Sequence, residues 1–281
     1  MITHPTPAPA FAVKPLQKLT DHLPALLFRV YLLVFFAYIL TPLAILALAT
    51  FNESSFPTVT PWLGTTTKWI VDMLTDRELW QALKVSLLIA AGVIVISVPT
   101  GLAAALVLTS LHGKAKSFFY ALMVSPMLTP GVVLGIATLL FWRRAGIGGG
   151  ITLSILAQSS FIIAFVMLMV VARLQRFDRT MEEAALGLGA SRFYVFRRIL
   201  LPYLRPSLLA AACIAFLQSF ENYNTTLFVR GTETPLTIFI AAKVRAGLTP
   251  AINALGLTLM IMTILGAILW EVLRKKRSAI S

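Results

Sequence analysis

The polar cluster that begins at Gln218 contains the first residues whose types could do chemistry. The apolar run LLAAACIAFL passes directly into QSFENYNTTL. Within this segment Glu221 supplies a carboxylate that attracts cations, while Asn222 and Asn224, like Gln218, supply amides that donate and accept hydrogen bonds. Such groups suit the recognition or passage of a polar solute.

Catalytic and metal-binding chemistry are not indicated by the remaining candidates. Cys213 is the sole cysteine, so no intrachain disulfide can form and redox chemistry is not expected. His4, His22 and His112 lack metal-ligand spacing. Because no nucleophile–base set accompanies Glu221, we expect neither a bound metal nor an enzyme.

The composition places the polar cluster in a membrane protein. Of the 281 residues, 58% are hydrophobic and 12% are charged, whereas a soluble domain is about 45–50% apolar and about 25% charged. We therefore expect an all-α membrane protein. Six segments have the roughly 20 apolar residues that a transmembrane helix needs: 28–50, 83–108, 118–142, 151–172, 206–227 and 252–273.

The distribution of lysine and arginine predicts how these spans are oriented. With six spans both termini lie on one side, and that side carries twice as many basic residues as the other. Basic loops stay in the cytoplasm, so both termini are expected to be cytoplasmic. Residues 1–27 are then a flexible cytoplasmic tail, and residues 28–281 form the membrane domain. The net charge of +13 thus indicates topology, and a nucleic-acid partner is not expected.

The longest inner loop, residues 173–205, is predicted to fold as two short helices. Thr180 can cap the first helix, and Glu183 three residues later completes a capping box. Two glycines then weaken or end that helix. Ser191 can cap the second helix, which is expected to end before Pro202 because proline cannot continue a helical hydrogen-bond ladder.

The same loop carries a motif that resembles a known family. The permease subunits of binding-protein-dependent ABC importers share an E-A-A-x3-G-x9-I-x-L-P loop, and this chain matches it at every defining position: Glu183, Ala184, Ala185, Gly189, Ile199, Leu201 and Pro202. The resemblance covers most of the chain. The stretches TTKWIVDMLTDRELWQALKVSL, SPMLTPGVVLGIATLLF and TPLTIFIAAKVRAGLTPAINALG look like the second permease of spermidine/putrescine-type transporters. Those relatives commonly carry paired aspartates where this chain has SFENYN.

The resemblance implies a type I importer permease in a bacterial inner membrane and a set of partners. These are a second permease subunit that makes a heterodimer, two ATP-binding subunits and an extracytoplasmic solute-binding protein. ATP and Mg would be bound by the ATPase, since this chain has no G-x-x-x-x-G-K-[ST] loop. The resemblance assigns the motif loop to ATPase coupling: Glu182 and Glu183 would lie at the contact, Gly189 would shape the backbone, and Ile199, Leu201 and Pro202 would brace the loop.

The polar cluster is then expected to line the translocation path. If the fifth span begins near Pro206, Glu221 lies about 22 Å from the inner face, in the outer half of the bilayer. Gln218, Glu221 and Thr225 have i, i+3, i+7 spacing and are predicted to share a helix face. A carboxylate facing lipid at this depth costs on the order of 2.5 kcal/mol, so it should face protein, water or a passing cation. An ion pair with a buried lysine or arginine is the structural alternative.

The rest of the cluster completes this prediction. Tyr223 or Phe220 would close an outer gate, and Asn222 and Asn224 would form hydrogen-bonding walls. In the third span, Pro126 and Pro130 predict a kink or a broken helix. In the fourth span, polar residues such as Gln158 are interpreted as packing groups.

Other functions and substrates remain open at this level. A self-sufficient secondary transporter or channel would need its own gating or energising elements, and nothing in the sequence suggests paired inverted halves. A membrane enzyme would need a catalytic set. Within the importer class a polyamine such as putrescine or spermidine is the first interpretation. Opine-like or amino-acid-derived solutes, organophosphonates, thiamine and ferric iron are carried by similar permeases.

Overall fold

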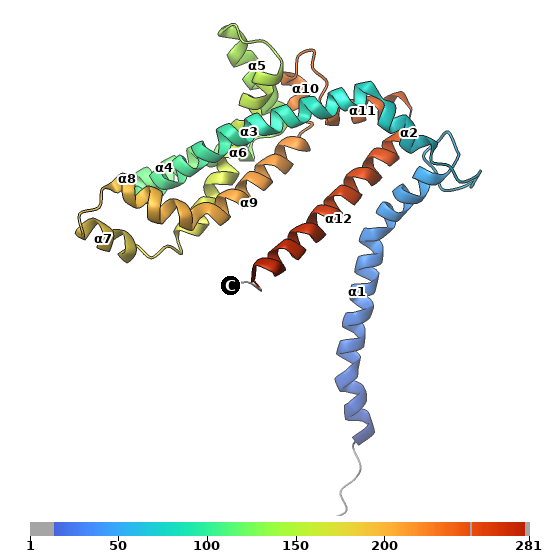
Figure 1. Cartoon of the computed structure of the whole chain (residues 1–281), viewed down its shortest axis with the longest axis horizontal. Helices are drawn as coiled ribbons and strands as arrows, with labels where there is room; N and C mark the ends of the chain where they lie inside the picture. The colour runs from blue at the N-terminus through green and yellow to red at the C-terminus, as the bar shows by residue number, and fades with distance from the viewer. Residues whose placement is uncertain (1–13, 248, 279–281) are drawn as a thin grey trace, which may run out of the picture. The chain divides into compact units, whose positions relative to one another are not determined.

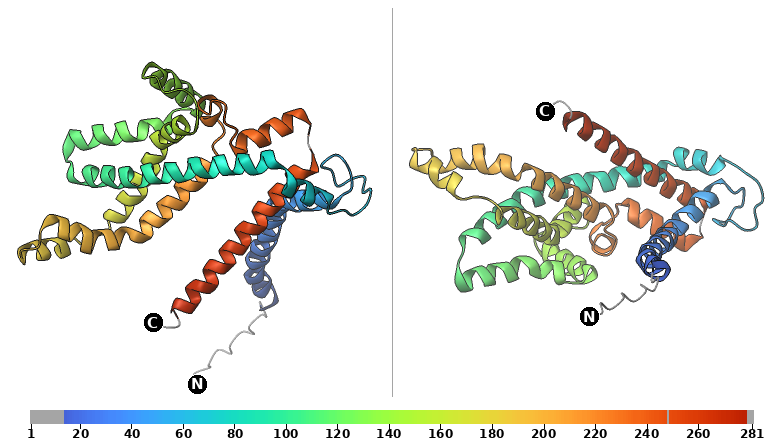
Figure 2. Two further views of the ribbon diagram at one scale, coloured as in Figure 1. Left: turned by 45° about the horizontal axis from the view of Figure 1, so that its top comes forward. Right: turned by 90° about the horizontal axis from the view of Figure 1, so that it is seen from below.

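The structure is a computed structural model that describes residues 14–247 and 249–278, and every described element except one isolated bridge is helical (Figures 1 and 2). The chain divides into two compact units. One combines residues 1–74 with 248–281, and the other is residues 75–247.

The first unit consists mainly of two long helices, α1 (Lys14–Phe51) and α12 (Pro250–Ser278), which pack against each other. They approach closely where Gly256 faces Leu46, since a Cβ at Gly256 would lie 3.1 Å from the Leu46 side chain. The apolar side chains of α1 are mostly exposed between Leu26 and Leu48, as expected for a helix that contacts lipid or another subunit. Helix α1 already begins at Lys14, so residues 14–27 of the predicted tail are helical, and residues 1–13 lie outside the described residues.

A compact turn joins α1 to the short helix α2 (Lys68–Thr75). The buried amide of Asn52 organises this turn: its nitrogen donates to the carbonyls of Thr58 and Pro61, and its oxygen accepts from the backbone N–H of Leu63 at 3.0 Å. The indole N–H of Trp69 donates to the backbone carbonyl of Asn52 at 2.9 Å. These hydrogen bonds satisfy backbone groups that have no helical partner after the end of α1.

The core of the second unit is formed by α3 (Arg77–Ser110), α6 (Ile151–Leu174) and α9 (Leu201–Phe220), which lie side by side in Figures 1 and 2. Asp76 starts α3, because its carboxylate accepts from the backbone N–H of Glu78 and Leu79. Buried aliphatic side chains from the three helices interdigitate: Ile89, Val93, Ile162, Val166, Leu204 and Ala211. The polar segment after α9 is thus attached to a packed core of three helices.

Four helices are long and apolar enough to cross a membrane in the part of the chain that the structure describes, or five if one bent pair counts as a single span. The first, second and fourth predicted spans lie within α1, α3 and α6. The apolar part of α12 that the structure describes, Pro250–Gly266, is shorter than these helices. The total of six spans and the side of the termini therefore stay predictions.

The third predicted span is not one straight helix. It is divided into α4 (Gly113–Leu128) and α5 (Gly131–Arg144), which are bent by 104°. Thr129 is extended (φ −81°, ψ 134°), as a residue before proline prefers, and Pro130 cannot donate to the preceding turn. The break predicted from the prolines is confirmed, and the predicted span over 118–142 corresponds to this bent pair of helices.

The fifth predicted span begins earlier and ends earlier than expected. Helix α8 (Arg192–Val195), a π-helical segment η1 (Phe196–Leu200) and α9 form one continuous helix, so the predicted end before Pro202 is wrong. The N–H of Leu201 bonds to the carbonyl of Phe196, five residues back, and this wider turn accommodates the proline ring within the helix. The helix then ends at Phe220, not near residue 227.

Short helices complete the second unit. They are α7 (Thr180–Gly187) in the inner loop, and α10 (Thr226–Val229) and α11 (Leu236–Ala246) after the polar segment.

Candidate functional site

The end of α9 at Phe220 changes how the polar cluster is built. Glu221 is the C-cap of α9, with φ −86° and ψ −4°, and the chain then turns away before α10 begins at Thr226. The prediction that Gln218, Glu221 and Thr225 share a continuous helix face is therefore wrong. The break in the helix, rather than helical periodicity, brings their side chains together.

These residues line a cavity of about 340 Å³ between α9, α6 and the break between α4 and α5. Six of the seven predicted path residues face it: Gln218, Glu221, Asn222, Tyr223, Asn224 and Thr225. Phe220 does not, because its ring stacks on Phe216 with centroids 5.4 Å apart. Of the two residues predicted to close an outer gate, only Tyr223 lines the cavity.

A buried hydrogen-bond network holds the broken segment in place. Gln158, 1% exposed on α6, accepts a hydrogen bond from the Ser219 hydroxyl and donates to the Thr226 hydroxyl at 2.7 Å. The side-chain oxygen of Asn222 accepts from the Thr226 hydroxyl at 3.0 Å and from the Thr226 N–H at 3.2 Å. The hydroxyl of Thr237 donates to the Asn222 carbonyl at 3.2 Å. The interpretation of Gln158 as a packing group is confirmed.

Two glycines of α5 allow this helix to lie directly against the broken segment. A Cβ at Gly135 would lie 2.7 Å from the Thr225 carbonyl oxygen, and one at Gly131 would lie 3.1 Å from the Asn224 side chain. Real Cβ atoms do not tolerate the first distance. Gly135 therefore leaves no room for a side chain, whereas a Cβ at Gly131 would require its neighbours to move by a few tenths of an ångström.

The carboxylate of Glu221 has no ion-pair partner among the described residues, and Lys243 pairs with Glu78 instead. The next two arginines along the chain bond elsewhere: Arg230 donates to the Glu233 carbonyl, and Arg245 donates to the Tyr223 hydroxyl at 3.0 Å. The alternative that Glu221 pairs with a lysine or arginine of this chain therefore fails within the described part. Its negative charge therefore lies at the cavity without a cationic partner from the described part of the chain.

The sequence reasoning missed the aromatic wall of the cavity. Phe161 and Phe165 of α6 line it. They stand at i+3 and i+7 from Gln158, so the helical spacing places all three on one face, and this spacing was the signal that could have identified them. Aromatic faces attract organic cations. A carboxylate, aromatic rings and amides around one cavity form a surface that suits a cationic amine.

The inner loop is organised differently from the predicted capping box. Asp178, not Thr180, caps the start of α7: its carboxylate accepts from the Thr180 hydroxyl at 2.8 Å and from the Thr180 N–H at 2.9 Å. These hydrogen bonds, led by that of the hydroxyl, lower the pKa of Asp178. A capping side chain acts from a position before the helix. Asp178 holds such a position, whereas Thr180 is already the first residue of α7. Glu183 makes no capping bond to Thr180.

The rest of the loop agrees with the sequence. Ser191 caps α8 by accepting from the Tyr194 N–H at 3.2 Å. Gly189 has φ +85°, a conformation that glycine adopts without strain. Helix α7 carries Glu182 and Glu183 in its first turn and has no buried residue, and Leu188 after it is 90% exposed. An exposed helix with an uncovered leucine is suited to contact a protein partner. Of the other motif residues, Ala185, Ile199 and Leu201 are half-buried, and Ala184 and Pro202 are exposed.

Comparison with known proteins gives a consistent set of similarities. Residues 97–278 match the family described as binding-protein-dependent transport system inner membrane component. The chain is 33% identical over 255 residues to the putrescine transport system permease protein PotI of Escherichia coli K12, covering 88% of this chain and 90% of that protein. It is 30% identical over 251 residues to the spermidine/putrescine transport system permease protein PotC of the same strain, covering 88% and 94%.

Solved structures show the same fold at lower sequence identity. A chain of a bacterial ABC transporter that imports the acidic polysaccharide alginate superimposes with a TM-score of 0.67 at 14% identity, covering 96% of this chain and 99% of that one. A chain of the MetNI methionine ABC transporter superimposes with a TM-score of 0.54 at 20% identity, covering 72% and 94%.

Proposed function

Since this chain belongs to the family of inner membrane components of binding-protein-dependent transport systems, we propose that it forms half of the path through which an importer takes up polyamines. The chain is the permease subunit of an ABC importer and resides in the bacterial inner membrane. The substrate, the path residues and the partner set are the parts that we propose.

The observation that carries the substrate proposal is the unpaired Glu221 in a cavity with an aromatic wall. A protonated amine that enters the cavity gains the carboxylate of Glu221 and the ring faces of Phe161 and Phe165. The cavity of about 340 Å³ has the size of a small-ligand pocket. The names of PotI and PotC, which refer to putrescine and to spermidine with putrescine, support the same substrate class.

Charge favours a polyamine over the anionic alternatives. An organophosphonate in the cavity would meet the Glu221 carboxylate as a like charge, and like charges repel each other. Thiamine and other cationic solutes would meet a favourable charge. The paired aspartates of related permeases are replaced here by one carboxylate, and fewer negative charges would bind the amine less tightly as it passes.

The partner set follows from the exposed coupling helix. We propose that α7 docks on one of two ATP-binding subunits, which hold ATP and Mg, and that Glu182 and Glu183 contact that subunit. Ala185, Ile199 and Leu201 are half-buried, which supports the idea that they brace the helix. A second, different permease would complete the path opposite Glu221, and an extracytoplasmic solute-binding protein would deliver the substrate. This chain itself has no proposed catalytic role.

Uptake by the complete importer tests the proposal. The two permeases, the ATPase and the binding protein are expressed together in cells that lack other polyamine uptake, and accumulation of labelled putrescine is measured. We expect ATP-dependent accumulation that unlabelled putrescine or spermidine competes away and that a phosphonate leaves unchanged. Accumulation of another solute class without putrescine would exclude the substrate. Transport by this permease with the ATPase and binding protein but no second permease would exclude the heterodimer.

A further inference from the structure

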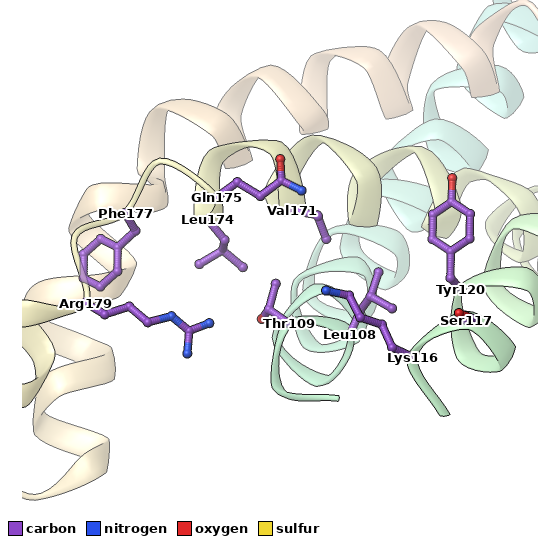
Figure 3. Close-up of a pocket in the computed structure, with 10 residues that line it drawn as sticks. All are labelled: Leu108, Thr109, Lys116, Ser117, Tyr120, Val171, Leu174, Gln175, Phe177 and Arg179. Atoms are coloured by element: carbon purple, nitrogen blue, oxygen red, sulfur yellow. The ribbon is translucent and has the colours of Figure 1, made fainter. Parts of the chain in front are cut away.

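A second cavity, of about 600 Å³, lies where the inner ends of three helices of the second unit meet (Figure 3). Its walls come from the end of α3, the start of α4, the end of α6 and the turn that leads into α7. The distribution of basic residues predicts that these helix ends lie at the cytoplasmic face of the membrane. The proposed translocation path does not use this cavity.

Two cationic side chains enter the cavity from opposite sides. Figure 3 shows the Lys116 ammonium group and the Arg179 guanidinium group extending toward each other near Thr109. The lining includes no aspartate or glutamate. Glu182 lines an adjoining cavity of about 170 Å³ that shares Arg179, but within the described residues neither Lys116 nor Arg179 forms an ion pair. Two like charges that converge without a counterion create a site for an anion.

The remaining residues that line the cavity are partly apolar and partly polar. Leu108, Val171, Leu174 and Phe177 form hydrocarbon surface next to the two cations. The Ser117 and Tyr120 hydroxyls and the Gln175 amide also line the cavity, and each can donate a hydrogen bond to a phosphate oxygen. A ligand that uses the whole cavity therefore combines a negative headgroup with a hydrocarbon chain.

We propose that this cavity binds the phosphate group of an anionic phospholipid from the cytoplasmic leaflet. Lys116 and Arg179 would neutralise the phosphodiester, and the upper part of an acyl chain would lie on Leu174 and Val171. Basic pockets between transmembrane helices at the cytoplasmic side suit such headgroups. Free phosphate shares the charge chemistry but gains nothing from the apolar wall. A bound headgroup connects Arg179, which directly precedes α7, to α4, and so fixes the turn that positions the coupling helix.

The test measures lipid retained by the full-length chain in the assembled importer. The complex is placed in phosphatidylcholine nanodiscs that contain graded phosphatidylglycerol, and the phosphatidylglycerol bound per complex is measured by native mass spectrometry. The double variant Lys116→Gln, Arg179→Gln should weaken retention by about tenfold or more, since each basic residue near the surface contributes roughly fivefold. The variant Lys116→Arg keeps the charge and should retain the lipid.

A matched control separates this site from general surface charge. Lys114→Gln, Arg176→Gln removes the same charge from exposed neighbours that do not line the cavity, and it should leave retention within about twofold of the unmodified complex. Equal losses in both double variants, or no loss in either, would overturn the proposal. Displacement of the lipid by millimolar inorganic phosphate would also overturn it in favour of a site for a free anion. Failure of Lys116→Arg to restore retention relative to Lys116→Gln would contradict the role of the charge.

Discussion

The side-chain amide of Gln158 donates to the hydroxyl of Thr226 over 2.7 Å and so connects α6 to the chain that follows the end of α9. The two residues are 68 positions apart. Their bond is buried, and it fixes where α10 begins after the helix break. The shape of the cavity that contains Glu221 therefore depends on a residue that does not line it.

Replacement of Gln158 by leucine should destabilise the permease. The change leaves the buried hydroxyls of Ser219 and Thr226 without one of their partners, and an unsatisfied buried polar group costs about 1–3 kcal/mol. Thermal unfolding of the purified complex should show a lower midpoint. Ser160→Ala is the matched control, because the Ser160 hydroxyl donates to a carbonyl of its own helix, and an equal midpoint for the two variants would argue against the network.

Replacement of Gly135 by alanine should displace the segment Asn224–Thr225. A Cβ would lie 2.7 Å from the Thr225 carbonyl oxygen, and such overpacking costs about 1–3 kcal/mol. We expect uptake to fall severalfold because the cavity wall moves. In the control Gly148→Ala, the new Cβ meets no atom within 4 Å. Unchanged uptake in Gly135→Ala would show that α5 can move away without consequence.

Replacement of Glu221 by glutamine should lower polyamine uptake by about tenfold, which corresponds to about 1.4 kcal/mol. The amide keeps the size of the side chain but removes the charge that attracts the amine. Assembly of the complex and affinity of the binding protein should not change, since Glu221 has no ion-pair partner in the described chain. Glu233→Gln is the control, because Glu233 lines a different cavity. Unaltered uptake kinetics would mean that the carboxylate faces bulk water or serves packing.

Replacement of Gly189 by valine should impair coupling to the ATPase. The φ angle of +85° costs an L-residue about 1–2 kcal/mol, and more for a β-branched one. ATP hydrolysis stimulated by the binding protein should decrease. Gly187→Ala should have little effect, because a Cβ there meets no atom within 4 Å and the residue lies in ordinary helical conformation. Full stimulation in Gly189→Val would show that the turn adapts.

Replacement of Thr180 by valine should raise the pKa of Asp178 toward its usual range. The Thr180 hydroxyl is the leading cause of the lowered pKa, and valine removes it. Because the pKa of Asp178 is lowered, its contribution to the stability of α7 is complete at pH values above the unfolded-state pKa, near 3.8. The contribution is lost as the pH falls through the folded-state pKa. Carboxyl-carbon NMR titration measures the shift. Thr180→Ser keeps the hydroxyl and should keep the low pKa, whereas equal pKa values in both variants would contradict this account.

The sequence by itself determined the class of the protein and the location of its functional segments. Apolar runs of sufficient length can be buried only in lipid, so α1, α3 and α6 were predictable from local composition. The spacing of Glu183, Gly189 and Pro202 indicated the permease family and the loop for which we propose a coupling role. The polar residues from Gln218 to Thr225 were recognisable as a candidate site because charged and amide groups are costly within an apolar run.

Only the tertiary structure decided how those residues are presented. The end of α9 at Phe220 is accompanied by the bond between Gln158 and Thr226, and Gln158 lies 68 positions from Thr226, so no local propensity encodes it. The π-helical turn η1 likewise allows the helix to continue through Pro202. A sequence rule that ends helices at proline cannot predict this turn. The cavity with Lys116 and Arg179 exists because three helix ends and the turn before α7 converge. Sequence patterns report the environment of each residue along one helix, whereas a cavity and a helix break are set by contacts between helices, and these are fixed when the chain packs.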